Sequence, residues 1–82
     1  MSAVALQNDT IWVETRNYAV VALNSRLSTH IPELKKALQK GAPAYPDISR
    51  EGFYDLELLS GWSYINVHEG TRTVYLVAHT RT

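Results

Sequence analysis

The sequence predicts an α+β fold: a mostly antiparallel sheet of four to five strands, in the order ββαβββ, with one principal helix packed on one face. Three observations support this prediction. Residues 53–79 alternate between apolar and polar side chains with a period of two, which is typical of strands. Residues 28–41 have the apolar period of a helix. Between them, residues 42–52 contain two prolines and several turn-forming residues.

In length and composition the chain is that of one small globular domain, residues 1–82. Eight Lys and Arg residues balance eight Asp and Glu residues, so the formal net charge is zero. Nucleic acids and anionic membranes bind concentrated positive charge, and neither is therefore expected as a partner. The sequence contains no cysteine, which excludes a disulfide framework, a thiolate nucleophile and a cysteine-ligated metal.

The first part of the chain is predicted to end in a pair of strands. Residues 1–9 lack the basic start and the apolar run of a signal peptide, so we expect a flexible N-terminus and a cytoplasmic protein. Thr10–Arg16 has β-branched residues at every second position and is predicted to be a strand. A two-residue turn at Arg16-Asn17 would let Tyr18–Asn24 pair back on it. The alternative is a helix over Tyr18–Leu27, because periodicity does not classify a short apolar run.

One helix is predicted after these strands. Ser28 or Thr29 can cap it, and Pro32 suits its first turn, where no N–H partner is needed. Gly41 ends it, as glycine commonly does. Residues 42–52 are then expected to form a Pro-containing surface loop with little regular structure. The apolar stripe of the helix consists of Ile31, Leu34 and Leu38.

A three-stranded antiparallel meander is predicted for the rest of the chain: Phe53–Leu59, Trp62–Glu69 and Arg72–His79. Ser60-Gly61 and Gly70-Thr71 would be its two-residue turns, because glycine favours the turn types of hairpins. These turns fix the register and give one apolar face for the helix to cover. The cross-strand rows on that face are Tyr54–Val67–Val74, Leu56–Ile65–Leu76 and Leu58–Ser63–Ala78.

The opposite face of the meander carries an unusual number of aromatic rings. A contiguous apolar patch with Trp and Tyr is typical of a protein interface. We therefore expect a small non-catalytic interaction or regulatory protein, which associates with itself as a homodimer or larger, or with another protein. Alternatively, a hairpin containing Trp12 or the loop containing Tyr45 covers this face within the monomer. The expected interface residues are Leu59, Trp62, Tyr64, Tyr75, Val77 and His79.

The polar end of the same face is a candidate ligand site. A carboxylate beside an imidazole is the arrangement used in general-base catalysis, so the alternative function is a small-molecule-binding protein or an enzyme. A flat sheet offers no enclosed pocket, which favours the non-catalytic interpretation. The candidate ligand-site residues are Asp55, Asn66, His68 and Tyr75.

Metal, cofactor and nucleic-acid sites are not expected. His68 and His79 share a predicted face but would lie ~20 Å apart, at ~3.3 Å per residue, so they cannot share a metal. His30, at the helix start, is expected to be exposed or to act as a cap. The aromatic rings can stack on bases, but the acidic residues on this face repel phosphate. The sequence has no phosphate-binding loop or zinc-protease motif.

Overall fold

The computed structural model describes residues 18–81. Three predictions lie outside this range: the flexible residues 1–9, the strand Thr10–Arg16 with its Trp12 and the turn at Arg16-Asn17. In chain order, the elements are β1 (Ala19–Ala22), the 3₁₀ helix η1 (Ser25–His30), α2 (Ile31–Lys40), β2 (Ala44–Pro46), β3 (Phe53–Leu58), β4 (Gly61–His68) and β5 (Thr73–Arg81).

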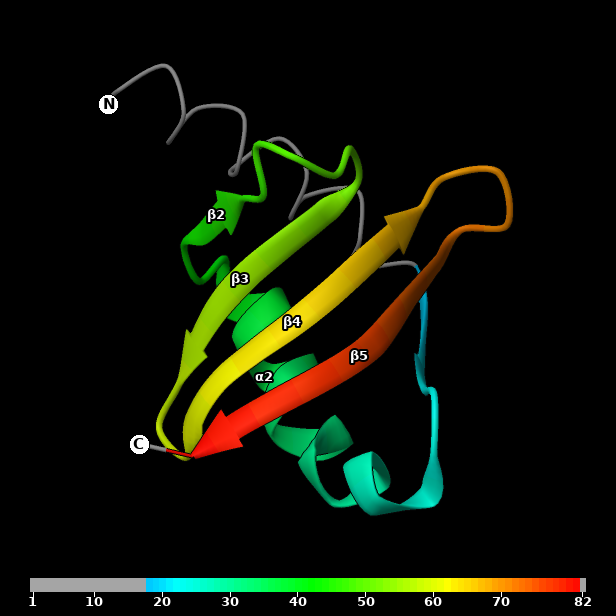
Figure 1. Cartoon of the computed structure of the whole chain (residues 1–82). Helices are drawn as coiled ribbons and strands as arrows, with labels where there is room; N and C mark the ends of the chain where they lie inside the picture. Colours follow the sequence, from blue (N-terminus) through cyan, green and yellow to red (C-terminus); the bar gives the residue numbers. More distant parts are fainter. Residues whose placement is uncertain (1–17, 82) are drawn as a thin grey trace.

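The predicted α+β class is confirmed: in the described part of the chain, one α-helix packs on a five-stranded sheet (Figure 1). The strand order is β1-β5-β4-β3-β2. The sheet is mixed, because β1 runs parallel to β5 while every other pair is antiparallel. β1 and β2 are therefore the two edges, and α2 lies behind the sheet between them (Figure 1). Within residues 18–81, no helix is long and apolar enough to span a membrane.

The strand predicted over Tyr18–Asn24 is present as β1, and the alternative helix over Tyr18–Leu27 is wrong for these four residues. Their adjacent β-branched residues favour an extended backbone. The observed partner is β5, with Ala19 opposite Thr73. This pairing joins residues far apart in the sequence, so no local turn signal could have indicated it.

The helical region begins earlier than predicted and in a different form. The Asn24 side chain accepts a hydrogen bond from the Leu27 N–H at 3.2 Å and starts η1. The predicted cap at Ser28 or Thr29 is wrong, because both residues lie inside η1 and the Ser28 hydroxyl donates instead to the Ser25 carbonyl. α2 follows directly, with His30 at its N-cap position but without a side-chain cap bond.

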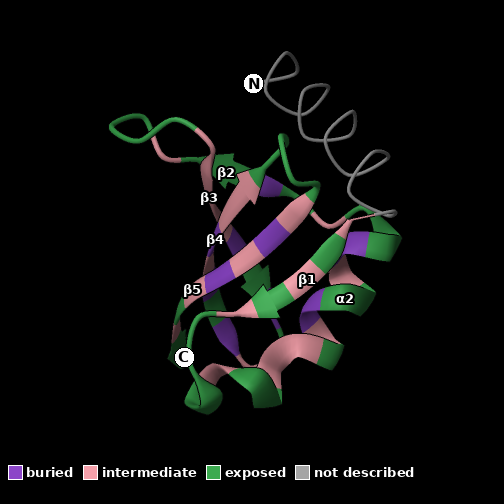
Figure 2. Cartoon of the chain, turned by 90° about the vertical axis from the view of Figure 1, so that its right-hand side faces the viewer, coloured by how far each residue is buried: buried purple, intermediate pink, exposed green. Residues whose placement is uncertain are grey.

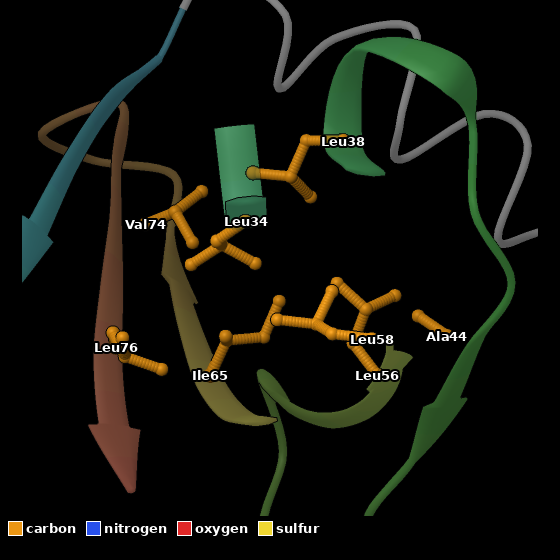
Figure 3. Close-up of a cluster of buried hydrophobic side chains, with 8 residues drawn as sticks. All are labelled: Leu34, Leu38, Ala44, Leu56, Leu58, Ile65, Val74 and Leu76. Carbon is orange, nitrogen blue, oxygen red and sulfur yellow. The ribbon is translucent and has the colours of Figure 1, made fainter. Parts of the chain in front are cut away.

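The rest of α2 agrees with the sequence. Pro32 lies in its first turn, and Gly41 adopts a left-handed φ of 74° at its C-cap. Leu34 and Leu38 are buried, one turn apart on the side that faces the sheet (Figure 3). This helix is short, and packing of its apolar stripe contributes more to its stability than helix propensity alone.

The region predicted as a loop, residues 42–52, contains the short strand β2. Tyr45 of β2 lies opposite Asp55, so β2 adds an edge to the sheet beside β3. The rest of residues 42–52 is outside any helix or strand, as predicted. The two prolines concealed β2 in the sequence, although an edge strand tolerates proline where no N–H is required. The chain then turns back through residues 47–52, where the Asp47 carboxylate accepts the Ser49 N–H at 3.0 Å.

The hydrophobic core lies between α2 and the sheet (Figure 3). Buried and partly buried residues alternate along β4 and β5, as the predicted period of two requires (Figure 2). Each fully buried Leu, Ile or Val side chain stabilises the fold by about 1.5–3 kcal/mol relative to an exposed one. The buried apolar residues are Leu34, Leu38, Ala44, Leu56, Leu58, Ile65, Val74 and Leu76.

The predicted register between β4 and β5 is correct near their turn. Ile65 lies opposite Leu76, as predicted, and the Arg72 N–H donates to the Glu69 carbonyl across the turn at 3.2 Å. Further along, a β-bulge interrupts the ladder between Tyr64 and Ile65 and makes Val77 an extra residue. Beyond the bulge, the predicted pairing of Ser63 with Ala78 is wrong.

The bulge moves each later residue of β5 to the other face of the sheet. Ser63 lies opposite His79, and Tyr64 lies opposite Ala78. His79 therefore points toward the helix side, with Ser63, and not toward the aromatic face on which it was predicted. A single extra residue has this effect because successive side chains on a strand alternate in direction.

The predicted register between β3 and β4 is shifted by two residues. Leu58 lies opposite Gly61 and Tyr54 opposite Ile65, so the turn is Leu59-Ser60 and not Ser60-Gly61. A shift of two keeps every side chain on its predicted face, whereas a shift of one would have reversed them all. The composition of the core face is therefore as predicted, although its rows are not.

Gly61 is required at the start of β4 for a reason other than a turn. Its φ is 144°, and a Cβ added there would lie 2.1 Å from the Thr80 carbonyl oxygen. Only glycine allows β5 to approach this closely. The glycine that indicated a turn in the sequence marks a close contact between two strands.

Replacement of Ile65 by alanine should lower the free energy of unfolding by about 2–4 kcal/mol, because a fully buried side chain is lost and the cavity closes only in part. Urea denaturation followed by fluorescence measures the change. Ile48→Ala is the matched control, because Ile48 is fully exposed and its loss should change stability by less than about 0.5 kcal/mol. Equal effects of the two substitutions would contradict the described core.

Gly61→Ala should lower the free energy of unfolding by at least about 3 kcal/mol, because its Cβ would overlap the backbone of β5. Gly41→Ala is the control, because Gly41 also has a positive φ but open space around it. That substitution should cost only about 1 kcal/mol. Thermal unfolding of both variants tests the contact, and a Gly61→Ala protein as stable as Gly41→Ala would refute it.

Candidate functional site

The face of the sheet that points away from α2 is called here the second face. Trp62 and Tyr64 of β4 and Tyr75 of β5 lie on it, as predicted, and Val77 joins them at the bulge. Leu59 is in the turn, fully exposed, and not in a strand. The structure thus brings four of the six predicted interface residues onto one surface, whereas Leu59 lies beside α2 in the β3–β4 turn and His79 points to the helix side.

Part of the second face is covered by the loop after β2. The Tyr64 hydroxyl donates a hydrogen bond to the Asp47 carboxylate, and the Phe53 and Tyr64 rings stack at 5.4 Å. The Arg50 guanidinium lies 3.9 Å from the centre of the Phe53 ring, within the range of a cation–π contact. The alternative that residues 42–52 cover this face within the monomer therefore holds for the Phe53 end.

The hydrogen bond between Tyr64 and Asp47 changes the pKa of both groups. It holds the pKa of the Asp47 carboxyl below its ordinary value, together with bonds from Ser49, because these donors favour the charged form. The same bond raises the pKa of the Tyr64 hydroxyl, since ionised tyrosine could not donate to Asp47. The hydrogen bond from Tyr64 to Asp47 therefore holds the loop against the sheet, next to the stacked rings of Phe53 and Tyr64.

The other end of the second face is open among the described residues. The Tyr45 and Trp62 rings lie 6.0 Å apart in a tilted arrangement, and 47% of Tyr45 and 37% of Trp62 remain exposed. Val21 of β1 is also 43% exposed, but it lies opposite Tyr75, in the row of Phe53, and therefore at the other end of the face. The open aromatic surface at the Trp62 end is formed by Tyr45 and Trp62.

The predicted ligand site is only partly assembled. Asn66 lies opposite Tyr75, but Asp55 lies opposite Tyr64, four residues along β4 from His68. This spacing separates Asp55 from His68 by about 13 Å, because a strand rises ~3.3 Å per residue. The two-residue shift in register moved them apart. The carboxylate–imidazole pair expected for general-base catalysis is therefore not formed.

The polar residues of that predicted site have local partners instead. The Asn66 side chain donates to the Gly52 carbonyl at 3.2 Å, and the His68 ring lies 3.1 Å from the Thr71 hydroxyl. A hollow of about 400 Å³ lies beside Asn66 and His68, but neither Asp55 nor Tyr75 lines it. These hydrogen bonds hold the start of β3 and the β4–β5 turn in place.

A polar network that the sequence analysis missed lies on the helix side of the sheet. Glu33 of α2 accepts hydrogen bonds from the Ser60 hydroxyl at 2.6 Å and from the Ser60 N–H at 3.2 Å. The Ser60 oxygen lies 3.3 Å from His79 Nε2, and His79 Nδ1 lies 2.9 Å from the hydroxyl of the buried Ser63. His30 stacks on His79, with ring centres 3.8 Å apart.

The direction of these hydrogen bonds follows from Glu33. An ionised carboxylate only accepts, so Ser60 donates to Glu33 and its oxygen accepts the Nε2 proton of a neutral His79. Ser63 then donates to Nδ1. The bond from the Ser60 hydroxyl, helped by the N–H groups of Ser60 and Leu59, holds the pKa of Glu33 below its ordinary 4.5. Burial, and then the adjacent His30, lowers the pKa of His79 below 6.5.

This network is not arranged to activate a nucleophile. A catalytic serine must donate its proton to the histidine, whereas Ser60 donates to Glu33. Ser63 donates to His79 but is fully buried, so no substrate could contact it. Within residues 18–81, no group of three His, Cys, Asp or Glu side chains is placed to hold a metal ion. The network instead fastens α2 to the β3–β4 turn.

The sequence carried little signal for this network. Glu33 and Ser60 are far apart in the chain, and His79 reaches them only because of the bulge. The apolar run from Leu76 to Ala78, which breaks the strict alternation of β5, was the one local indication of that bulge. His30 was expected to be exposed or to act as a cap, and it instead contributes a ring contact.

The lowered pKa of His79 predicts a dependence of stability on pH. Because the folded state disfavours protonation, the unfolded chain binds more protons below pH 6.5, and stability rises with pH in that window. The free energy of unfolding should be highest above pH 6.5, and it should fall as the pH drops from 6.5 through the pKa of His79 in the folded state. Protonation of Glu33 should lower the free energy of unfolding further when the pH falls below 4.5, which is the ordinary pKa of this carboxyl.

Urea denaturation at pH values from about 8 to about 5 measures this dependence. His79→Gln should abolish the part of the loss that begins below 6.5, whereas the exposed His68→Gln should retain it. A wild-type stability that is constant across the range, or one that still falls in the His79→Gln protein, would contradict the neutral state assigned to this ring.

Comparisons with protein-family models, with curated proteins and with solved structures found no match for this chain.

Proposed function

We propose that this protein is a small, non-catalytic, cytoplasmic interaction protein that forms a homodimer through the second face of its sheet. The observation that carries the proposal is the aromatic end of that face, which residues 18–81 leave open, with Tyr45 and Trp62 47% and 37% exposed. A sheet normally buries one face against each neighbouring layer, and α2 occupies only the other side (Figure 1).

The composition of the second face supports a protein partner. Tyr and Trp contribute strongly at the centres of interfaces, and polar side chains commonly surround them. Here the exposed Trp62 lies opposite Glu57 and Thr80, which form a polar border at this end. The Asp47 and Arg50 contacts form a second polar border at the Phe53 end.

The size of the face is suited to a second copy of the chain. The five strands have 4, 3, 6, 8 and 9 residues, and each residue covers about 3.3 Å along the strand and about 4.8 Å across it. The flat projection of the face is therefore on the order of 500 Å², and its ridged side-chain surface is larger. A stable interface buries about 800 Å² on each partner, so this face approaches the area that a dimer needs.

Charge also favours self-association. The formal net charge is zero, so two copies do not repel each other at long range. Arg50 lies at one end of the face and Glu57 at the other. A two-fold axis that runs across the strands would bring Arg50 of one copy toward Glu57 of the second copy. Such complementarity sets the orientation of a dimer more than its affinity.

Light scattering after size exclusion tests the proposal. The wild-type protein should have twice the monomer mass of 9.2 kDa at micromolar concentrations. Trp62→Glu should give a monomer, because it removes an exposed ring and adds a carboxylate opposite Glu57 that the interface would desolvate.

Gln39→Glu is the matched control, since it adds the same charge at an exposed position of α2, on the other side of the sheet. This variant should remain a dimer. A wild-type protein that is monomeric at several hundred micromolar, or a Trp62→Glu protein that keeps the dimer mass, would overturn the proposed interface.

A further inference from the structure

A groove of about 440 Å³ lies on the helix side of the sheet, where α2 faces the end of β3. Its apolar lining comes from Ala37 of α2, Ala42 and the last part of β3 and its turn, Leu58 and Leu59. Leu59 is fully exposed at its mouth. The volume is within the range of small-molecule sites, which are mostly apolar with a few placed polar groups.

One end of the groove is fixed by the polar network described above. Glu33 lines the groove, but its carboxylate already accepts the Ser60 hydroxyl and the N–H groups of Ser60 and Leu59. These bonds hold α2 against the turn and leave little capacity for a ligand. They also hold Leu58 and Leu59 in place, so the apolar wall exists before any ligand binds.

Two lysines on α2 supply the positive charge of the groove. Lys36 and Lys40 are one helical turn apart, so they lie on the same side of the helix, and both line the groove. Within residues 18–81, neither ammonium group has an ion-pair partner. Glu57 also borders the groove, but its side chain shares the second face with Trp62. Glu33 is ionised, so the two ammonium groups and this one carboxylate leave the helix side of the groove with a net charge of +1.

We propose that this groove binds a small amphipathic monocarboxylate. The apolar chain of the ligand lies along Ala37, Ala42 and Leu58, and its carboxylate lies between the ammonium groups of Lys36 and Lys40. A single negative charge suits the site better than a phosphate, because one carboxylate balances the net charge that Lys36, Lys40 and Glu33 give the groove. The groove is separate from the aromatic end of the second face, and the site does not depend on the proposed dimer.

Titration of the ¹⁵N-labelled protein with octanoate, followed by two-dimensional NMR, tests the site directly. Saturable shifts should appear at the amides of residues 36–42 and 57–59, with a Kd on the order of 1 mM. 1-Octanol, which has the same chain without the charge, should bind about tenfold more weakly, a difference of about 1.4 kcal/mol.

Lys36→Glu should weaken octanoate binding by about tenfold or more, because it replaces an attractive charge with a repulsive one. Lys35→Glu is the matched control: it makes the same change at the adjacent exposed residue of α2, which does not line the groove. Binding to this variant should stay within about twofold of wild type.

Three results would overturn the site. They are equal affinity for octanoate and 1-octanol, equal effects of the two lysine variants, and no saturable shift up to about 10 mM octanoate. Shifts centred on Tyr45 and Trp62 would also contradict it, because they would indicate adsorption to the second face. None of these outcomes bears on the dimer, which is measured by mass and by the Trp62→Glu variant.

Discussion

The crossing of β5 over Gly61 is the constraint on which most of the structure depends. The Thr80 carbonyl oxygen occupies the space of any side chain at this position, so the two strands approach closely only because Gly61 has none. In the same pair of strands, Val77 is an extra residue in β5. Beyond it, the side chains of β5 that were expected on the second face point toward α2. His79 reaches Ser63 and Ser60 as a result, and through Ser60 it is linked to Glu33 of the helix. The contact at Gly61 holds the end of β5 close to β4, and the bulge turns His79 toward the helix.

The two sides of the sheet are consequently specialised. The helix side is closed by leucine packing in its middle and by a chain of hydrogen bonds at one end. The second face is covered by the loop after β2 near Phe53, and its aromatic side chains are exposed near Trp62. A sheet with one open apolar end is a natural surface for association, and a helix side with a preformed groove is a natural place for a small ligand.

Much of the fold could be predicted because its signal is local. The alternation of side chains in β3, β4 and the first part of β5 assigns each residue to a face whatever the exact register, so the core was correct there even where the rows were not. Beyond the bulge in β5, the predicted faces of Ala78 and His79 were reversed. Pro32 and Gly41 likewise mark the helix by backbone geometry alone. These features depend on neighbours in the sequence, which a single chain displays.

The candidate site was harder to predict because it depends on contacts between distant segments. Gly61 has two physical explanations in sequence, a turn or a close approach, and the commoner one was chosen. The meeting of Asp55 and His68 required a register that was wrong by two residues. The link from Glu33 to Ser60 joins a helix to a turn on another element, and no spacing rule connects them.

The parallel pairing of β1 with β5 has a consequence for how the protein folds. The β3–β4 and β4–β5 turns bring neighbouring strands together over a few residues, whereas Ala19 meets Thr73 only after roughly fifty intervening residues are arranged. Closing a chain segment of that length carries an entropic cost of about 3–4 kcal/mol. The contacts of β1, a strand of four residues, cannot offset this cost by themselves. We therefore expect β1 to dock onto a sheet whose other strands and helix have already formed.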